Sequence, residues 1–203
     1  MTTNIEKLIN FLESPAFQNS ETGLFHPTYI YTYKAEDEYL MQENLQLILA
    51  RLKRPNHFLD SLLVNLYDEL IAYLKSNALM DATVFDEIVD FEKEDAPAAL
   101  KWLFEEVHNE AFITYFSEKI KAHFGQSGNK KKVYLLIEGV GDVFPYLRAS
   151  DFLKRIESLA KNFKVILFYP GVYQEKYYNL FGELKTDNIY RATLLNQLIY
   201  QKY

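Results

Sequence analysis

The chain has 203 residues, of which 49% are hydrophobic and 25% charged, and its formal net charge is −6. These values are typical of a folded globular protein, and the acidic balance leaves no basic stripe for nucleic acid. The absence of cysteine excludes disulfides, thiolate metal sites and a cysteine nucleophile. No apolar run is long enough to span a bilayer and residues 1–14 do not form a signal peptide, so we expect a cytoplasmic protein.

The first third of the chain predicts alternating helices and strands. Apolar residues recur with helical spacing over 5–12 and again over 41–52. Between them, residues 29–33 read Tyr-Ile-Tyr-Thr-Tyr, a run rich in strand-forming residues. The apolar residues 62–64 predict a short buried strand, which passes directly into a helical pattern that begins at Tyr67.

Residues 78–124 contain no strand signal and predict two or three helices, interrupted at Ala96-Pro97. Within residues 81–110 there are ten acidic and two basic residues, so the acidic charge is concentrated in this segment. The sequence leaves open whether the segment docks onto a basic surface or only keeps the protein in solution. We expect the helices to turn the following residues inward: Leu100, Phe104, Val107, Phe112, Phe116, Ile120 and Phe124.

Residues 133–171 have the form of a β-α-β unit. Two apolar runs, 133–138 and 165–169, are separated by one amphipathic helix, so the two strands must be parallel. A last edge strand is predicted within 190–195. The whole pattern predicts an α/β fold whose mostly parallel sheet has a Rossmann-like or P-loop-like topology, flanked by helices. We expect one domain over residues 1–203, with the helical segment 78–124 as an insertion.

Glycine turns follow both strands of this unit, at Gly139-Val140-Gly141 and at Pro170-Gly171. The ends of parallel strands meet at one edge of a sheet, where α/β folds place ligands and partners. A dinucleotide-binding loop would need a third glycine at the position of Phe144. Pro145 has no backbone N–H that could donate to an anion. The chain also contains no Gly-x-x-x-x-Gly-Lys-Ser/Thr motif. We therefore expect no nucleotide cofactor. The large side chains that follow the turns predict instead a recognition surface.

No catalytic group stands out in the sequence. Glu138 ends an apolar strand, where a catalytic acid could lie, but a hydrogen bond to the turn amides or simple exposure explains it better. There is no Gly-x-Ser-x-Gly nucleophile motif. Because no catalytic group stands out, we do not expect an enzyme. We also expect no metal site, because the four histidines lie in separate segments: His26, His57, His108 and His123.

Several segments resemble the BrxB proteins of the bacteriophage-exclusion (BREX) defence systems. The resemblance is carried by Leu-Leu-Ile-Glu-Gly-Val-Gly-Asp-Val-Phe-Pro-Tyr-Leu-Arg (135–148), Val-Ile-Leu-Phe-Tyr-Pro-Gly-Val-Tyr (165–173) and Leu-Phe-Gly-Glu-Leu-Lys-Thr-Asp-Asn-Ile-Tyr-Arg-Ala (180–192). The chain has Glu138 where the family usually has threonine. It also lacks the Ser-His pair and the Leu-Asn-Asn-Leu helix that usually follow the position of Arg148.

The resemblance implies a small component of a defence assembly that also contains a methyltransferase, a large ATPase and the phosphatase-superfamily protein PglZ. We expect a non-enzymatic adaptor that binds another of these proteins, with PglZ as the first candidate and the methyltransferase or the ATPase as others. A degenerate nucleotide-binding or hydrolytic domain is the alternative. The expected partner surface consists of Gly139, Val140, Gly141, Phe144, Pro145, Tyr146, Arg148, Tyr169, Pro170, Gly171, Tyr173 and Arg191.

Overall fold

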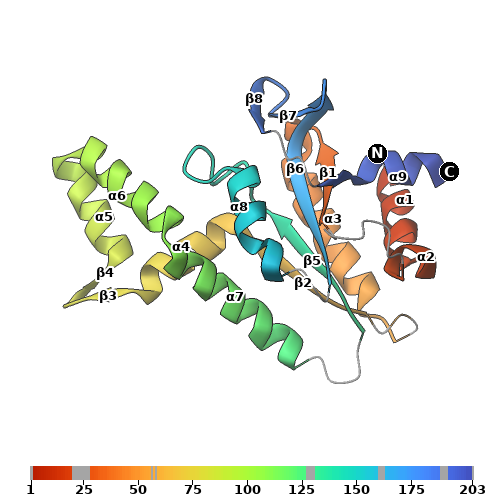
Figure 1. Ribbon diagram of the computed structural model, residues 1–203, viewed down its shortest axis with the longest axis horizontal. Helices are drawn as coiled ribbons and strands as arrows, with labels where there is room; N and C mark the ends of the chain where they lie inside the picture. Colours follow the sequence, from red (N-terminus) through yellow and green to blue (C-terminus); the bar gives the residue numbers. More distant parts are fainter. Residues whose placement is uncertain are drawn as a thin grey trace.

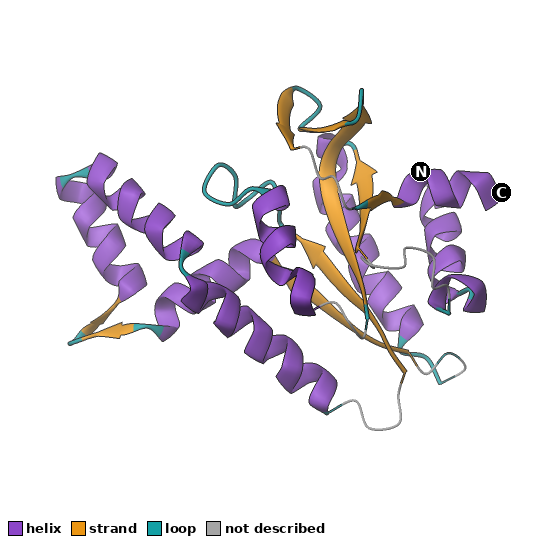
Figure 2. Ribbon diagram, viewed as in Figure 1, coloured by secondary structure: helices purple, strands orange, loops and turns teal. Residues whose placement is uncertain are grey.

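The computed structural model describes residues 2–19, 28–55, 57, 59–126, 131–159, 163–187 and 192–202. They form a layered α/β structure in which helices cover both faces of a central sheet (Figures 1 and 2). This architecture confirms the predicted α/β class. None of the helices in these ranges is both long and apolar enough to cross a membrane.

The central sheet is parallel throughout its main path, with the strand order β2-β5-β6-β1-β9. β5 and β6 are direct neighbours, with Leu135 opposite Val165, which confirms the predicted β-α-β unit. β9 lies at the edge beside β1, within the segment predicted as a last strand. The strands are β1 (Thr28–Tyr33), β2 (Leu59–Asn65), β5 (Lys131–Glu138), β6 (Lys164–Gln174) and β9 (Thr193–Leu194).

β6 does not end at Pro170-Gly171, and the predicted turn at this pair is wrong. The strand continues to Gln174 and forms an antiparallel extension with β7 (Tyr177–Leu180) and β8 (Leu184–Asp187). The backbone carbonyl of Pro170 accepts a hydrogen bond from the N–H of Phe181 at 2.8 Å. A Cβ on Gly171 would lie 2.1 Å from the carbonyl oxygen of Asn179, so glycine is required for the close approach of β7 rather than for a turn.

One face of the sheet is covered by the two ends of the chain together with α3. Alternate strand residues, such as Tyr134, Leu136 and Ile166, point to this face and pack against the helices. Tyr134 also donates its hydroxyl hydrogen to the carbonyl of Leu12, at 2.7 Å. The helices are α1 (Thr2–Glu13), α2 (Pro15–Gln18), α3 (Glu38–Leu52) and α9 (Leu195–Lys202), with a short 3₁₀ turn at Ala35–Asp37 before α3.

The opposite face is covered by α4 (Leu66–Ser76), α7 (Glu110–Gly125) and α8 (Ala149–Ile156), which a 3₁₀ turn at Glu157–Leu159 follows. The residues of α7 predicted to face inward are buried, and the ring of Phe116 packs edge-on against that of Phe152. His123 Nε2 lies 3.0 Å from Asp60 Oδ1, which ties the end of α7 to β2.

A helical arm projects from this second layer, at the left of Figure 1. It consists of β3 (Ala78–Leu79), β4 (Ala82–Thr83), α5 (Val84–Glu94) and α6 (Ala96–His108). The break at Ala96-Pro97 is confirmed, because Asp95 caps α6 by accepting the N–H of Ala98. The short hairpin of β3 and β4 was not predicted. The prediction for Leu100 and Phe104 is also wrong, because both side chains are about half exposed.

Candidate functional site

The loop after β5 and the β6–β8 extension meet at the carboxyl edge of the sheet (Figure 1). A Cβ on Gly141 would lie 2.9 Å from the Phe181 ring and 3.3 Å from Pro170 Cγ. The two segments predicted to share an edge are therefore in contact, although the second is a hairpin rather than a turn.

The predicted surface residues divide into an exposed and a buried group. Tyr169 is fully buried, and it packs edge-on against Tyr178 rather than flanking a groove. The other buried members are Gly139, Val140, Pro170 and Gly171, so this group supports the surface from within. Pro145, Arg148 and Tyr173 are exposed, and the partly exposed members are Gly141, Phe144 and Tyr146. Arg191 lies outside the described residues.

The β6–β8 extension also exposes four large apolar side chains that the sequence reasoning missed: Val172, Tyr177, Phe181 and Leu184. No sequence pattern indicated them, because the Pro-Gly pair was interpreted as the end of the strand. We use the name rim surface for the exposed and partly exposed residues of both segments: Gly141, Phe144, Pro145, Tyr146, Arg148, Val172, Tyr173, Tyr177, Phe181 and Leu184.

Gly139 holds the loop in its position beside β2. Its φ angle is +76°, and a Cβ would lie 2.4 Å from Asn65 Oδ1. That oxygen accepts the N–H groups of Tyr67 and Asp68 and so caps α4. The glycine therefore permits both the left-handed backbone and the helix cap next to it.

Four carboxylates, which we call the acidic cluster, gather beneath this edge: Glu38, Asp68, Glu138 and Asp142. Glu138 is only 6% exposed, and its Oε2 has no hydrogen-bond partner among the described residues. Glu38 Oε2 accepts a hydrogen bond from the Tyr33 hydroxyl at 2.7 Å. These side chains come from the carboxyl end of β5, the loop that follows it, and the first turns of α3 and α4.

Burial and neighbouring negative charge raise the pKa of two members of the acidic cluster, Glu138 and Glu38. Burial, and then the negative charges of Glu38, Asp68 and Asp142, raise the pKa of Glu138 to about 7. Burial is also the main cause that raises the pKa of Glu38. The concentration of carboxylates disfavours a polyphosphate at this edge. After β1, the residues are Lys34-Ala35-Glu36-Asp37, without the glycines of a phosphate-binding loop.

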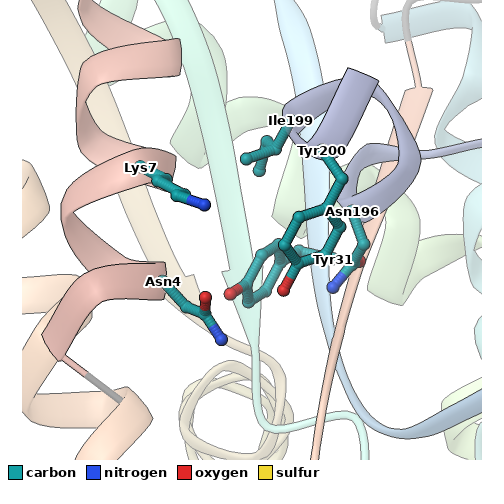
Figure 3. Close-up of a pocket in the computed structure, with 6 residues that line it drawn as sticks. All are labelled: Asn4, Lys7, Tyr31, Asn196, Ile199 and Tyr200. Carbon is teal, nitrogen blue, oxygen red and sulfur yellow. The ribbon is translucent and has the colours of Figure 1, made fainter. Parts of the chain in front are cut away.

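A separate pocket of about 380 Å³ lies at the carboxyl end of β1, where α1, α3 and α9 approach the strand. Figure 3 shows the adjoining hollow, into which side chains from α1, β1 and α9 point. Asn196 is not free to bind a ligand, since its amide pairs with the backbone N–H and carbonyl of Thr32, each at 2.9 Å. No sequence pattern indicates this pocket, because its lining residues come from both ends of the chain and from the segment of β1 and α3.

Among the described residues, the titratable groups do not form a recognisable catalytic or metal constellation. No group of three or more possible metal ligands occurs within the described ranges. His108 Nδ1 lies 2.8 Å from the carbonyl oxygen of Phe104, while His57 and His123 lie beside Glu13 and Asp60, in separate parts of the fold. His26 lies outside the described residues.

Comparison with known proteins identifies the family. The family model described as BrxB, BREX protein BrxB, matches residues 62–195. The BREX protein BrxB of Bacillus cereus (strain H3081.97) is 26% identical over 166 residues, which cover 81% of this chain and 80% of that protein. The BREX protein BrxB of Escherichia coli O9:H4 (strain HS) is 20% identical over 190 residues, covering 94% of this chain and 87% of the relative. No solved structure matches the chain. Since the family model spans well over half of its length, the chain belongs to the BREX protein BrxB family.

Proposed function

We propose that this protein is a non-enzymatic adaptor of a BREX defence complex, acting in the cytoplasm, and that it binds another BREX protein through the rim surface. The observation that carries the proposal is the exposure of large side chains on both segments that meet at the carboxyl edge. Phe181 is 46% exposed and Tyr173 is 38% exposed, beside a loop that presents Arg148. Aromatic residues and arginine are the side chains enriched at interaction hot spots.

The construction of the rim surface also supports this role. The hairpin is continuous with β6, and its base rests on the buried rings of Tyr169 and Tyr178. A surface supported in this way is ordered before binding, so little conformational entropy is lost when a partner docks. The PglZ-type protein is our first candidate for the partner, with the methyltransferase and the ATPase as further candidates.

Co-purification of the tagged chain with the proteins encoded beside it tests the proposal. We expect Arg148→Glu and Phe181→Ala each to reduce partner recovery at least tenfold, because exposed hot-spot residues typically contribute about 2 kcal/mol or more. Lys121→Glu on α7 and Leu47→Ala on α3 are matched controls. Both residues are exposed, and neither belongs to the rim surface. Full recovery of every partner by folded Arg148→Glu and Phe181→Ala proteins would reject the rim surface as the binding site.

One observation favours a second candidate, a degenerate nucleotide-binding or hydrolytic domain. Glu138 lies at the carboxyl end of a central strand, and its pKa of about 7 suits a general acid or base. We rank this function second because no nucleophile or phosphate-binding loop accompanies Glu138 in the described residues. Isothermal titration with ATP, GTP and dinucleotides at millimolar concentration discriminates the two. Saturable binding of any of these nucleotides would favour the second function, whereas the adaptor requires none.

A further inference from the structure

The arm carries an apolar stripe that nothing in the described structure covers. Pro97, Leu100, Phe104 and His108 follow one another at positions i, i+3, i+7 and i+11 of α6, so they lie on one face of the helix. Leu100 is 50% exposed and Phe104 is 49% exposed. The ring of Phe104 stacks on that of His108 with their centroids 4.1 Å apart. We call these four residues the α6 stripe.

The α6 stripe is not needed to hold the arm together. The buried side of α6 is formed by Ala99 and Val107, and Trp102 packs edge-on against Phe91 of α5. Glu106 fastens the helix further, because its two oxygens accept hydrogen bonds from Trp102 Nε1 at 3.2 Å and from the Tyr73 hydroxyl at 3.3 Å. α6 therefore already has a buried face that packs against the rest of the arm. The exposed Leu100 and Phe104 are not needed for this packing.

The arm that carries the stripe is strongly acidic. The ten acidic and two basic residues of 81–110 all belong to the arm or to the first residue of α7. Some of these charges are used locally: Asp86 caps α5, and Lys93 pairs with Asp90 at 2.7 Å. The exposed Glu87, Glu92 and Glu94 have no such pairing within the described structure. An apolar ridge within a negative field selects for a binding partner that is apolar on one side and positive around it.

We propose that the α6 stripe docks a basic amphipathic helix of another protein. A straight helical ridge fits the helix-to-helix mode of recognition, in which apolar side chains at i, i+3 or i+4 and i+7 interdigitate. A second copy of this chain fits less well, since two like-charged arms would be brought together. Anionic lipid and nucleic acid are repelled by the same charges. This surface is separate from the rim surface, so one protein can hold two partners.

Photocrosslinking in the intact defence complex tests the occupant directly. The full chain would carry p-benzoylphenylalanine at position 104, or at the exposed control position 47, and the crosslinked peptides would be identified by mass spectrometry. We expect position 104 to capture a segment of a different protein that has a net positive charge and helical apolar spacing. Capture of this chain itself, of an acidic segment, or of nothing would overturn the proposal.

The affinity of a synthetic probe gives an independent measurement. An 18-residue peptide of lysine and leucine, patterned as an amphipathic helix, should bind the full chain, as measured by fluorescence anisotropy. We expect Leu100→Ser/Phe104→Ser to weaken this binding at least tenfold, and Arg148→Glu and Leu47→Ser to leave it unchanged. A scrambled peptide of the same charge should bind at least tenfold more weakly than the patterned one. Equal binding by the double variant and the unaltered chain, or by both peptides, would show that charge alone attracts the probe and would refute the docking site.

Discussion

Neutralising Glu138 should stabilise the protein, and the gain should depend on pH. The carboxyl group is buried among three other carboxylates and has an unpartnered oxygen in the described structure. Its pKa is about 7 in the folded protein, against an ordinary value of 4.5. Because the folded state holds the proton more tightly, the free energy of unfolding falls as the pH rises from about 4.5 through about 7.

The size of this effect follows from the two pKa values. Each tenfold change in proton affinity corresponds to about 1.4 kcal/mol, so the full difference corresponds to roughly 3 kcal/mol. Asp68 and Asp142 are exposed, and solvent screens their charges, so we expect about 1–2 kcal/mol. Glutamine keeps the shape of the side chain without its charge. The Glu138→Gln variant should therefore match the unaltered protein near pH 5 and exceed its stability by this amount at pH 8.

Urea denaturation followed by circular dichroism at pH 5, 6, 7 and 8 measures the difference. Titrating groups outside the acidic cluster contribute equally to both proteins, so they cancel when the two unfolding free energies are subtracted. Glu87→Gln is the control, since this exposed glutamate lies on α5 outside the acidic cluster, and its difference should not change with pH. A Glu138→Gln protein that is no more stable at pH 8, or is less stable, would show that Glu138 is ionised and favourably paired in the folded protein.

Three further substitutions test the construction of the site. Gly139→Ala should cost roughly 2–4 kcal/mol in thermal or urea unfolding, because it combines backbone strain with loss of the α4 cap. Gly125→Ala, where nothing lies within 4 Å of the new Cβ, should change stability little, and equal losses would contradict the steric argument. Asn196→Ala should cost about 1–3 kcal/mol and speed amide exchange at Thr32, since it unpairs the β1 backbone; unchanged exchange would refute that role. Phe116→Ala should cost about 3–5 kcal/mol, against a negligible change for Phe104→Ala on the exposed stripe.

Local patterns predicted the sheet correctly where the strands are continuous apolar runs. Residues 134–138 and 165–169 of these runs are buried, as parallel strands between two helical layers must be, and the intervening helix requires the strands to be parallel. The same reasoning failed at Pro170. A proline followed by glycine can also lie inside a strand, at a point where one neighbouring strand ends and another approaches closely. The hairpin that follows could not be predicted without the partner strand.

Burial on helices was predicted less evenly. Phe112, Phe116 and Phe124 face the sheet, so their spacing and their burial agree. Leu100 and Phe104 have equally good helical spacing, but no layer of the described structure covers them. Periodicity indicates that a helix has an apolar face, and it does not distinguish a face buried in the core from one left exposed. The acidic cluster was missed for a related reason, since its members come from three segments that are distant in the sequence.

The unbroken course of β6 has a mechanical consequence. The same 11-residue strand lies between β5 and β1 in the middle of the sheet and also forms the first leg of the hairpin. A force applied to the hairpin tip is therefore transmitted along covalent backbone into the centre of the molecule, with no hinge between them. The hairpin should behave as a stiff lever, and its displacement by a bound protein would strain the most protected hydrogen bonds of the fold.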